Sequence, residues 1–173
     1  MSSKREAHVE ALQIALDTEK KGYKFYKVAA KSSKDPKGQE VFEHLAKDEI
    51  EHMGVIATVF ESLTKDQPWM TYEEAVEKFG ETPREKIIFP DVPEGTEEDF
   101  DDLKALEEAL EFEKKAVQFY TKQAQEADGE KAKAFYQSLI EIEESHVMII
   151  QAELDSLMGA GIWLGFQEIS LEH

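Results

Sequence analysis

The stretch LAKDEIEHM, residues 45–53, places two chemically active side chains inside an apolar helical pattern. Leu45 and Met53 are eight residues apart, a spacing that returns a helix to the same face. Glu49 and His52 share a face as well, because residues at i and i+3 are neighbours on a helix surface. The pattern therefore predicts a glutamate and a histidine that point together toward the interior of a helical protein.

The chain carries a second copy of this pattern. A shift of 94 positions, the separation of Glu19 and Glu113, places residues 15–21, ALDTEKK, on residues 109–115, ALEFEKK. The same shift places residues 45–53 on 139–147, and neither half needs a gap. So many matches at a single offset indicate an internal duplication. Three pairs of candidate metal ligands are related by the shift: Glu19 and Glu113, Glu49 and Glu143, and His52 and His146.

Helical periodicity and turn signals predict two long helical hairpins. The first covers about residues 4–63 and turns at Ser32–Pro36, where Asp35 is a favourable helix N-cap. The second covers about residues 101–158 and turns at Asp128-Gly129. Each hairpin holds one copy of the duplicated pattern.

A long crossover, residues 64–100, joins the hairpins. Thr71 and Glu74 make a capping-box pattern, which predicts a short extra helix over residues 71–79. Two hairpins joined by one long crossover have the connectivity of an all-α, ferritin-like four-helix bundle. We expect a single domain over residues 1–170.

The last segment, residues 159–173, is predicted to be a tail. Gly159 and Gly161 are expected to stop the last long helix, because glycine is common just after a helix end. Residues 162–166, IWLGF, are apolar enough to dock on the bundle. The final residues 171–173 carry no weight in this interpretation.

Composition excludes several classes of function. With 173 residues and no cysteine, the chain forms no disulfide, iron–sulfur cluster or thiolate zinc site, and we expect a reducing, cytoplasmic location. A formal charge of −18 repels nucleic acid and anionic membranes, so neither is an expected partner. The charged start Met1–Ala7 lacks a signal-peptide pattern, and the longest apolar run, Val147–Ile150, is too short to span a bilayer.

The duplicated residues are expected to meet in one layer near the middle of the bundle. In an antiparallel hairpin, residues equally far from the turn lie at equal height, and the single glutamates and the Glu-x-x-His pairs meet this condition to within about one turn. Four buried carboxylates carry four negative charges, which two divalent cations would cancel. One glutamate from each of two helices and Glu-x-x-His from each of the others is the ligand set of di-iron and di-manganese bundles. A metal-free bundle is the alternative.

These motifs resemble the rubrerythrin branch of the ferritin-like superfamily over residues 11–56 and 105–150. The resemblance implies two Fe ions per chain, although the oxygen and nitrogen ligands would also accept Mn or a mixed Fe/Mn pair. It further implies oxidation of the Fe(II) form by peroxide or dioxygen, and a homodimer. In this family the outer ligands would be Glu19 and Glu113, the bridges Glu49 and Glu143, and the terminal ligands His52 and His146.

The chain also departs from its apparent relatives. Rubrerythrins commonly carry a further glutamate one turn after the third-helix ligand, linked to iron movement in peroxidase cycling. Ala116 occupies that position here, and Gly22 its duplicate. Bacterioferritin shares the six ligands, but Ile50 replaces the methionine of its haem site, so no haem is expected. Without cysteine there is no rubredoxin domain, which implies a separate electron-donor protein.

Tyr26 and Tyr120 follow Glu19 and Glu113 by seven residues, two turns along the same helix faces. They are candidates to hydrogen-bond the ligand carboxylates, as tyrosines do near rubrerythrin-like sites, or to relay an electron. The alternative is a pair of core tyrosines whose hydroxyl groups find other partners.

Three further titratable residues receive different predictions. His8 and His44 are expected at the surface. Glu153 lies seven residues after His146 and is a candidate carboxylate on an access path near the bundle end.

The sequence thus predicts a di-iron oxidoreductase that oxidises Fe(II) with hydrogen peroxide or dioxygen and thereby reduces it. An iron-binding or storage protein without enzymatic turnover is a second hypothesis, which requires a hollow cage. A bundle that uses its metal only structurally is a third. Native mass separates the first two, since a dimer favours the enzyme, and turnover with peroxide separates the third.

Overall fold

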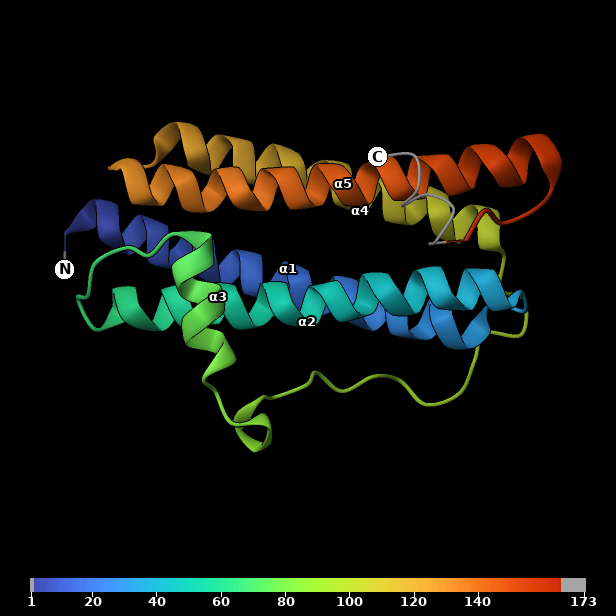
Figure 1. Cartoon of the computed structure of the whole chain (residues 1–173), viewed down its shortest axis with the longest axis horizontal. Coiled ribbons are helices and arrows are strands. Elements are labelled where there is room, and N and C mark those ends of the chain that lie inside the picture. The colour runs from blue at the N-terminus through green and yellow to red at the C-terminus, as the bar shows by residue number, and fades with distance from the viewer. Residues whose placement is uncertain (1, 166–173) are drawn as a thin grey trace.

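The computed structural model describes residues 2–165. Four long helices form two antiparallel hairpins, which confirms the predicted all-α four-helix bundle (Figure 1). The elements in chain order are α1 (Ser3–Ser32), α2 (Pro36–Thr64), α3 (Tyr72–Gly80), the 3₁₀ turn η1 (Arg84–Lys86), α4 (Asp102–Glu126) and α5 (Glu130–Ala160).

The hairpin α1–α2 lies against the hairpin α4–α5, and a long crossover connects them (Figure 1). The crossover leaves the end of α2, places α3 across that helix, and returns along the first hairpin to the start of α4. Within residues 2–165, no helix combines the length and the apolar character that crossing a membrane requires.

Local sequence explains where the helices begin and end. The Asp35 carboxylate accepts a backbone amide of the first turn of α2, as the sequence predicts. Thr71 and Glu74 form the predicted capping box at the start of α3. Helix α5 ends at Gly161, whose φ of 72° lies in the left-handed region that favours glycine. Gly159 is still helical, so the prediction that it stops the helix is wrong.

Apolar side chains of the four long helices fill the bundle interior. Each large side chain that is fully buried stabilises the fold by about 1.5–3 kcal/mol. Leu103 is 37% exposed although it is apolar, because it lies in the first turn of α4. The largest fully buried aliphatic side chains are Leu12, Leu45, Ile56, Leu63, Leu106, Leu139 and Ile150.

Helix α3 docks on α2 through one close approach. A Cβ atom at Gly54 of α2 would lie 2.2 Å from the Phe79 ring of α3, so only glycine lets the ring come this near. Glycine in a helix interior costs about 1 kcal/mol relative to alanine, and the Phe79 contact is what that cost permits.

The tail docks as predicted, up to the last described residue. Trp163 is buried, and its indole N–H donates to Asp102 over 3.1 Å. The backbone amides of Leu164 and Gly165 both donate to the carboxylate of Glu153, over 2.8 and 2.9 Å. Glu153 therefore anchors the tail, and its prediction as an access-path carboxylate is wrong. The predicted docking residue Phe166 and residues 171–173 lie outside the described residues.

Candidate metal centre

The structure brings all six duplicated residues together in the bundle interior. Helix α1 contributes Glu19 and α4 contributes Glu113, at matching positions of the two hairpins. Helices α2 and α5 each contribute a Glu-x-x-His pair. Every one of the six side chains is at most 2% exposed, which makes burial of four carboxylates in one place the dominant feature of the core.

The six residues form two overlapping groups. Ligand atoms of Glu19, Glu49 and His52 lie within 4.8 Å of one another. Ligand atoms of Glu49, Glu113, Glu143 and His146 lie within the same distance of one another, so Glu49 belongs to both groups. Glu143 also faces both histidines, because its Oε1 lies 3.7 Å from His52 Nδ1 and its Oε2 lies 3.2 Å from His146 Nδ1.

Two tyrosines hold the outer carboxylates across the hairpins. The Tyr26 hydroxyl of α1 donates to Glu113 Oε1 over 2.5 Å, and the Tyr120 hydroxyl of α4 donates to Glu19 Oε1 over 2.6 Å. Each tyrosine therefore serves the glutamate of the opposite hairpin, not the one two turns earlier on its own helix. Burial and the adjacent carboxylates raise the pKa of both phenols, so both remain hydrogen-bond donors.

Unpaired polar atoms separate the four glutamates into two kinds. In Glu19 and Glu113, Oε1 accepts a hydrogen bond from a tyrosine and Oε2 has no hydrogen-bond partner. Glu49 and Glu143 leave both carboxylate oxygens without one. Buried polar atoms are ordinarily paired, so such a concentration of unpaired ones indicates a ligand. One free oxygen suits a terminal metal ligand, and two suit a bridge between metals.

The histidines are oriented for the same purpose. His52 and His146 both present an unpaired Nδ1 to the carboxylates. His146 Nε2 lies 3.0 Å from Asp48 Oδ2, and when Nε2 carries the proton it donates to this carboxylate. That tautomer leaves the Nδ1 lone pair free for a metal, and such a carboxylate partner is typical of metal-bound histidine.

Asp48 is the residue of this site that sequence reasoning missed. It belongs to α2 and reaches the histidine of α5, so neither helix periodicity nor local spacing indicates the contact. The duplication gave no signal either, because the 94-residue shift relates Asp48 to Ile142. The histidine support of the two halves therefore differs in chemistry.

The electrostatics of the cluster favour a bound cation. Burial, reinforced by repulsion from Glu19 and Glu113, raises the pKa values of Glu49 and Glu143 far above their ordinary range. Burial alone would also raise the pKa values of Glu19 and Glu113, but their contacts with the other carboxyl groups, the histidines and the tyrosines lower both.

For the two histidines, burial and the neighbouring carboxylates shift the pKa in opposite directions. Burial alone would lower their pKa values, but neighbouring carboxylates outweigh it and raise the pKa of His52 and of His146. The raised pKa values of Glu49, Glu143, His52 and His146 mean that metal ions compete with protons at these four side chains.

Two other histidines complete the comparison with the sequence predictions. His8 is buried, so the prediction of a surface position is wrong. The crossover folds Trp69 over it, with the rings edge-on at 5.4 Å, and Tyr136 packs beside both rings, 6.3 Å from His8 and 5.6 Å from Trp69. His44 is partly exposed, which is closer to the surface position predicted for it than the burial of His8 is. Its Nε2 lies 3.3 Å from Asp48 Oδ2.

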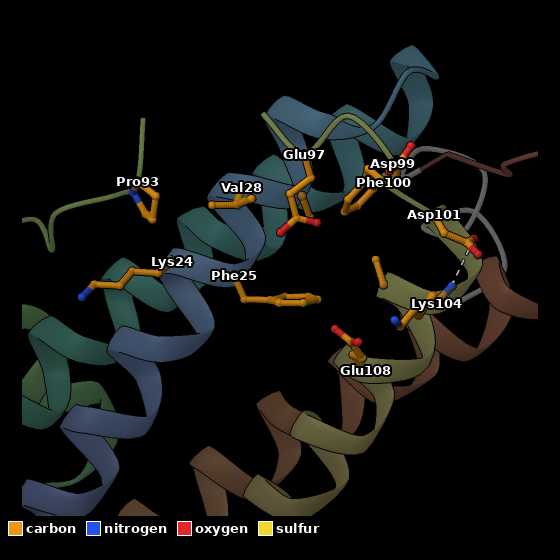
Figure 2. A pocket seen from close by; sticks show the side chains of 12 residues that line it. Lys24, Phe25, Val28, Pro93, Glu97, Asp99, Phe100, Asp101, Lys104 and Glu108 are labelled. Atoms are coloured by element: carbon orange, nitrogen blue, oxygen red, sulfur yellow. Dashed lines mark hydrogen bonds between the residues drawn. The ribbon is translucent and has the colours of Figure 1, made fainter. Parts of the chain in front are cut away.

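A separate hollow of about 470 Å³ lies where the crossover meets α1 and α4 (Figure 2). Phe25 of α1 faces Lys104 and Glu108 of α4, while Glu97 and Phe100 of the crossover close one side. None of its lining residues belongs to the buried cluster. This hollow therefore gives no direct path to the candidate metal centre.

Comparison with known proteins points to one family. No curated protein and no solved structure gives a significant match. The family model described as Rubrerythrin matches residues 10–154, a span that contains all six residues of the cluster. The chain belongs to the rubrerythrin family.

Proposed function

We propose that the chain binds two iron ions in this cluster and acts as an oxidoreductase that reduces hydrogen peroxide or dioxygen with electrons from Fe(II). The observation that carries the proposal is the division of the glutamates into two with one unpaired oxygen and two with both oxygens unpaired. Four ionised carboxylates balance two divalent cations, which explains why so much acid is buried together.

Each residue then has a defined role. Glu49 and Glu143, with two unpaired oxygens each, would hold both metals, and the two histidines would hold one metal each through Nδ1. The terminal glutamates keep their orientation because Tyr26 and Tyr120 fix their second oxygens. When bound, the two metals would bind and polarise the oxidant and supply two electrons to it.

The chain itself supplies position and a dry environment. The nearly complete burial of the six side chains keeps bulk water away from the ligands, which strengthens their interaction with a cation. The two tyrosine hydroxyls are the donors that the structure places beside the ligand carboxylates. We further propose that the protein is a homodimer. We also propose that it receives electrons from a separate donor protein, because the chain has no cysteine to hold an electron-transfer iron.

Metal analysis followed by rapid mixing tests the proposal. Protein loaded anaerobically with Fe(II) should hold two iron ions per chain and consume one peroxide for each two Fe(II), with two protons taken up and two waters formed. A single bound metal, or a loaded site that both peroxide and dioxygen leave in the Fe(II) form, would refute it. A large, cage-like native mass together with iron accumulation would favour storage instead.

A further inference from the structure

Two aromatic arms lead away from the cluster, and the 94-residue shift relates them. One arm, called here the Trp69 arm, consists of Tyr120, Tyr136 and Trp69. The other, the Trp163 arm, consists of Tyr26, Phe42 and Trp163. The only two tryptophans of the chain are thus related by the same duplication as the glutamates and histidines. One follows α2 and the other follows α5, and these two helices end at opposite ends of the bundle (Figure 1).

The two arms have nearly the same geometry. In the Trp69 arm, Tyr120 stacks on Tyr136 at 6.5 Å between ring centroids, and Tyr136 contacts Trp69 at 5.6 Å. In the Trp163 arm, Tyr26 stacks on Phe42 at 6.5 Å, and Phe42 contacts Trp163 at 5.5 Å. Each arm begins at a tyrosine hydroxyl that donates to a glutamate of the cluster.

The arms differ in what their middle rings can do. Phenol and indole rings lose one electron at potentials that oxidised metal centres reach in proteins, whereas a phenyl ring does not. Every ring of the Trp69 arm can therefore take part in one-electron transfer. The Trp163 arm is interrupted at Phe42, the position that corresponds to Tyr136.

The outer ends differ as well. Trp69 is partly exposed, and its neighbour His8 lines a surface hollow of about 340 Å³. Trp163 is 2% exposed. The hydroxyl of Tyr136 and Nδ1 of His8 both lack a hydrogen-bond partner, although their rings lie 6.3 Å apart between centroids. The Trp69 arm therefore has a base, His8, beside its middle phenol, Tyr136, and its outer ring, Trp69, reaches solvent.

We propose that Tyr120, Tyr136 and Trp69 form an electron relay between the buried cluster and the end of the bundle at Trp69, and that the Trp163 arm does not conduct. The relay rests on the proposed function, because it needs an oxidant at the cluster. Its role is to carry electrons inward from a one-electron donor when the oxidised centre would otherwise attack its own surroundings.

The relay balances at each step. Tyr120 gives one electron to the oxidised centre and its phenolic proton to Glu19. Tyr136 then returns an electron to Tyr120, which takes its proton back, while the Tyr136 proton passes to His8 through a bridging water. Trp69 reduces Tyr136 in turn, and the proton returns from His8. The net change is one electron moved from Trp69 to the centre, and an external one-electron donor restores the indole.

Peroxide treatment without an external donor makes the relay visible, because an oxidised indole that is not restored reacts on to stable oxygenated products. The full-length chain loaded with Fe(II) is mixed with peroxide, and mass spectrometry of its peptides measures oxygen incorporation at each tryptophan. We expect oxidation at Trp69 well above that at Trp163. The variant Tyr136→Phe should reduce the Trp69 signal toward the level at Trp163.

The variant is well matched to its purpose. Tyr136→Phe removes a hydroxyl without a hydrogen-bond partner and keeps the ring, so the fold and the exposure of Trp69 should persist. A purely structural role, or attack by free radicals in solution, would leave Trp69 oxidation unchanged in this variant. That result, with peroxide still consumed, would overturn the relay alone.

The second arm provides the reverse experiment. Phe42→Tyr restores a phenol to the Trp163 arm and should increase oxidation of Trp163. If both peroxide and dioxygen leave the Fe(II) centre of the wild-type chain unoxidised, the proposed function and the relay fail together. Peroxide consumption with equal oxidation of both tryptophans, in the wild type and in both variants, would leave the proposed function intact and refute the relay.

Discussion

At the scale of single residues, the cluster was predictable because its ligands follow short, regular spacings along the sequence. Glu49 and His52 occupy one helix face by spacing alone, and their copies 94 residues later exclude coincidence. Contacts between helices have no such period. The crossed tyrosine bonds and the Asp48–His146 contact depend on how the two hairpins face each other, which no local pattern encodes.

Asp48 should matter for only one of the two metals. Asp48→Ala removes the acceptor beside His146 Nε2, so we expect one metal to bind about 10- to 100-fold more weakly and the other to be little changed. Anaerobic metal titration measures both affinities. Glu144→Ala, which removes an exposed carboxylate next to Glu143, is the control. Equal weakening of both metals in Asp48→Ala would contradict this role.

The reverse change, which would give His52 the carboxylate partner that His146 has, can be made at Ile142. The duplication places this residue, relative to His52, where Asp48 lies relative to His146. We expect Ile142→Asp to bring the two metal affinities closer together by strengthening the weaker one. A titration in which the variant leaves the ratio of the two affinities as it is in the wild type would count against the symmetry argument.

The bridging glutamates should behave differently from the rest with and without metal. Glu49→Gln and Glu143→Gln each keep the side-chain volume but remove an anionic bridge, so each should abolish the two-metal site. In the metal-free protein the same changes should raise the melting temperature, because a neutral amide avoids the cost of burying a carboxyl group beside the other carboxylates. Retention of two metals at wild-type affinity would show that the bridging assignment is wrong.

At the scale of elements, the long helices follow from sequence, and the docking of the crossover does not. Asp35 and the pair Thr71 and Glu74 cap their helices through contacts a few residues long, which a sequence pattern can display. The placement of α3 depends on one space left by Gly54 and filled by Phe79. A helical glycine has several explanations, so its sequence alone does not reveal which ring occupies the space.

Gly54→Ala should therefore destabilise the protein although alanine favours helix. The new Cβ would overlap the Phe79 ring, and overpacking of this kind costs about 1–3 kcal/mol of unfolding free energy. Urea denaturation measures the loss. Gly159→Ala in α5 meets no atom within 4 Å and should instead be neutral or stabilising by up to about 1 kcal/mol. A stabilised Gly54→Ala variant would show that α3 does not depend on this contact.

At the scale of the whole molecule, duplication builds a nearly symmetric bundle in which the two halves have different surroundings. The ligand set and the tyrosines repeat, whereas Asp48, Phe42 and His8 have the unlike counterparts Ile142, Tyr136 and Asp102. The repeats can be recognised in the sequence because they match, whereas a mismatched position acquires a role only through its contacts in the folded chain. His8 is an example, since Trp69 covers it from another part of the chain.

The metal-free and metal-loaded proteins should respond to pH in opposite directions. Between about pH 8 and about pH 6, the groups that matter in the metal-free cluster are those whose pKa is raised by folding. His52 and His146 rise from an ordinary 6.5, and Glu49 and Glu143 rise from 4.5, so the native state binds more protons than the unfolded state. Stability that comes from raised pKa values increases as pH falls.

The remaining groups do not reverse this sign. The lowered pKa values of Glu19 and Glu113 act below 4.5, outside the window. Burial lowers the pKa of His8, so this single histidine opposes the trend set by Glu49, Glu143, His52 and His146. His8 lies outside the cluster, so its effect is the same with or without metal. Metal binding requires deprotonated ligands, so protons that stabilise the metal-free protein expel the metal. Melting temperatures measured across the window should rise toward acid without metal and fall toward acid with it, and parallel slopes would show that these four groups do not hold the metal.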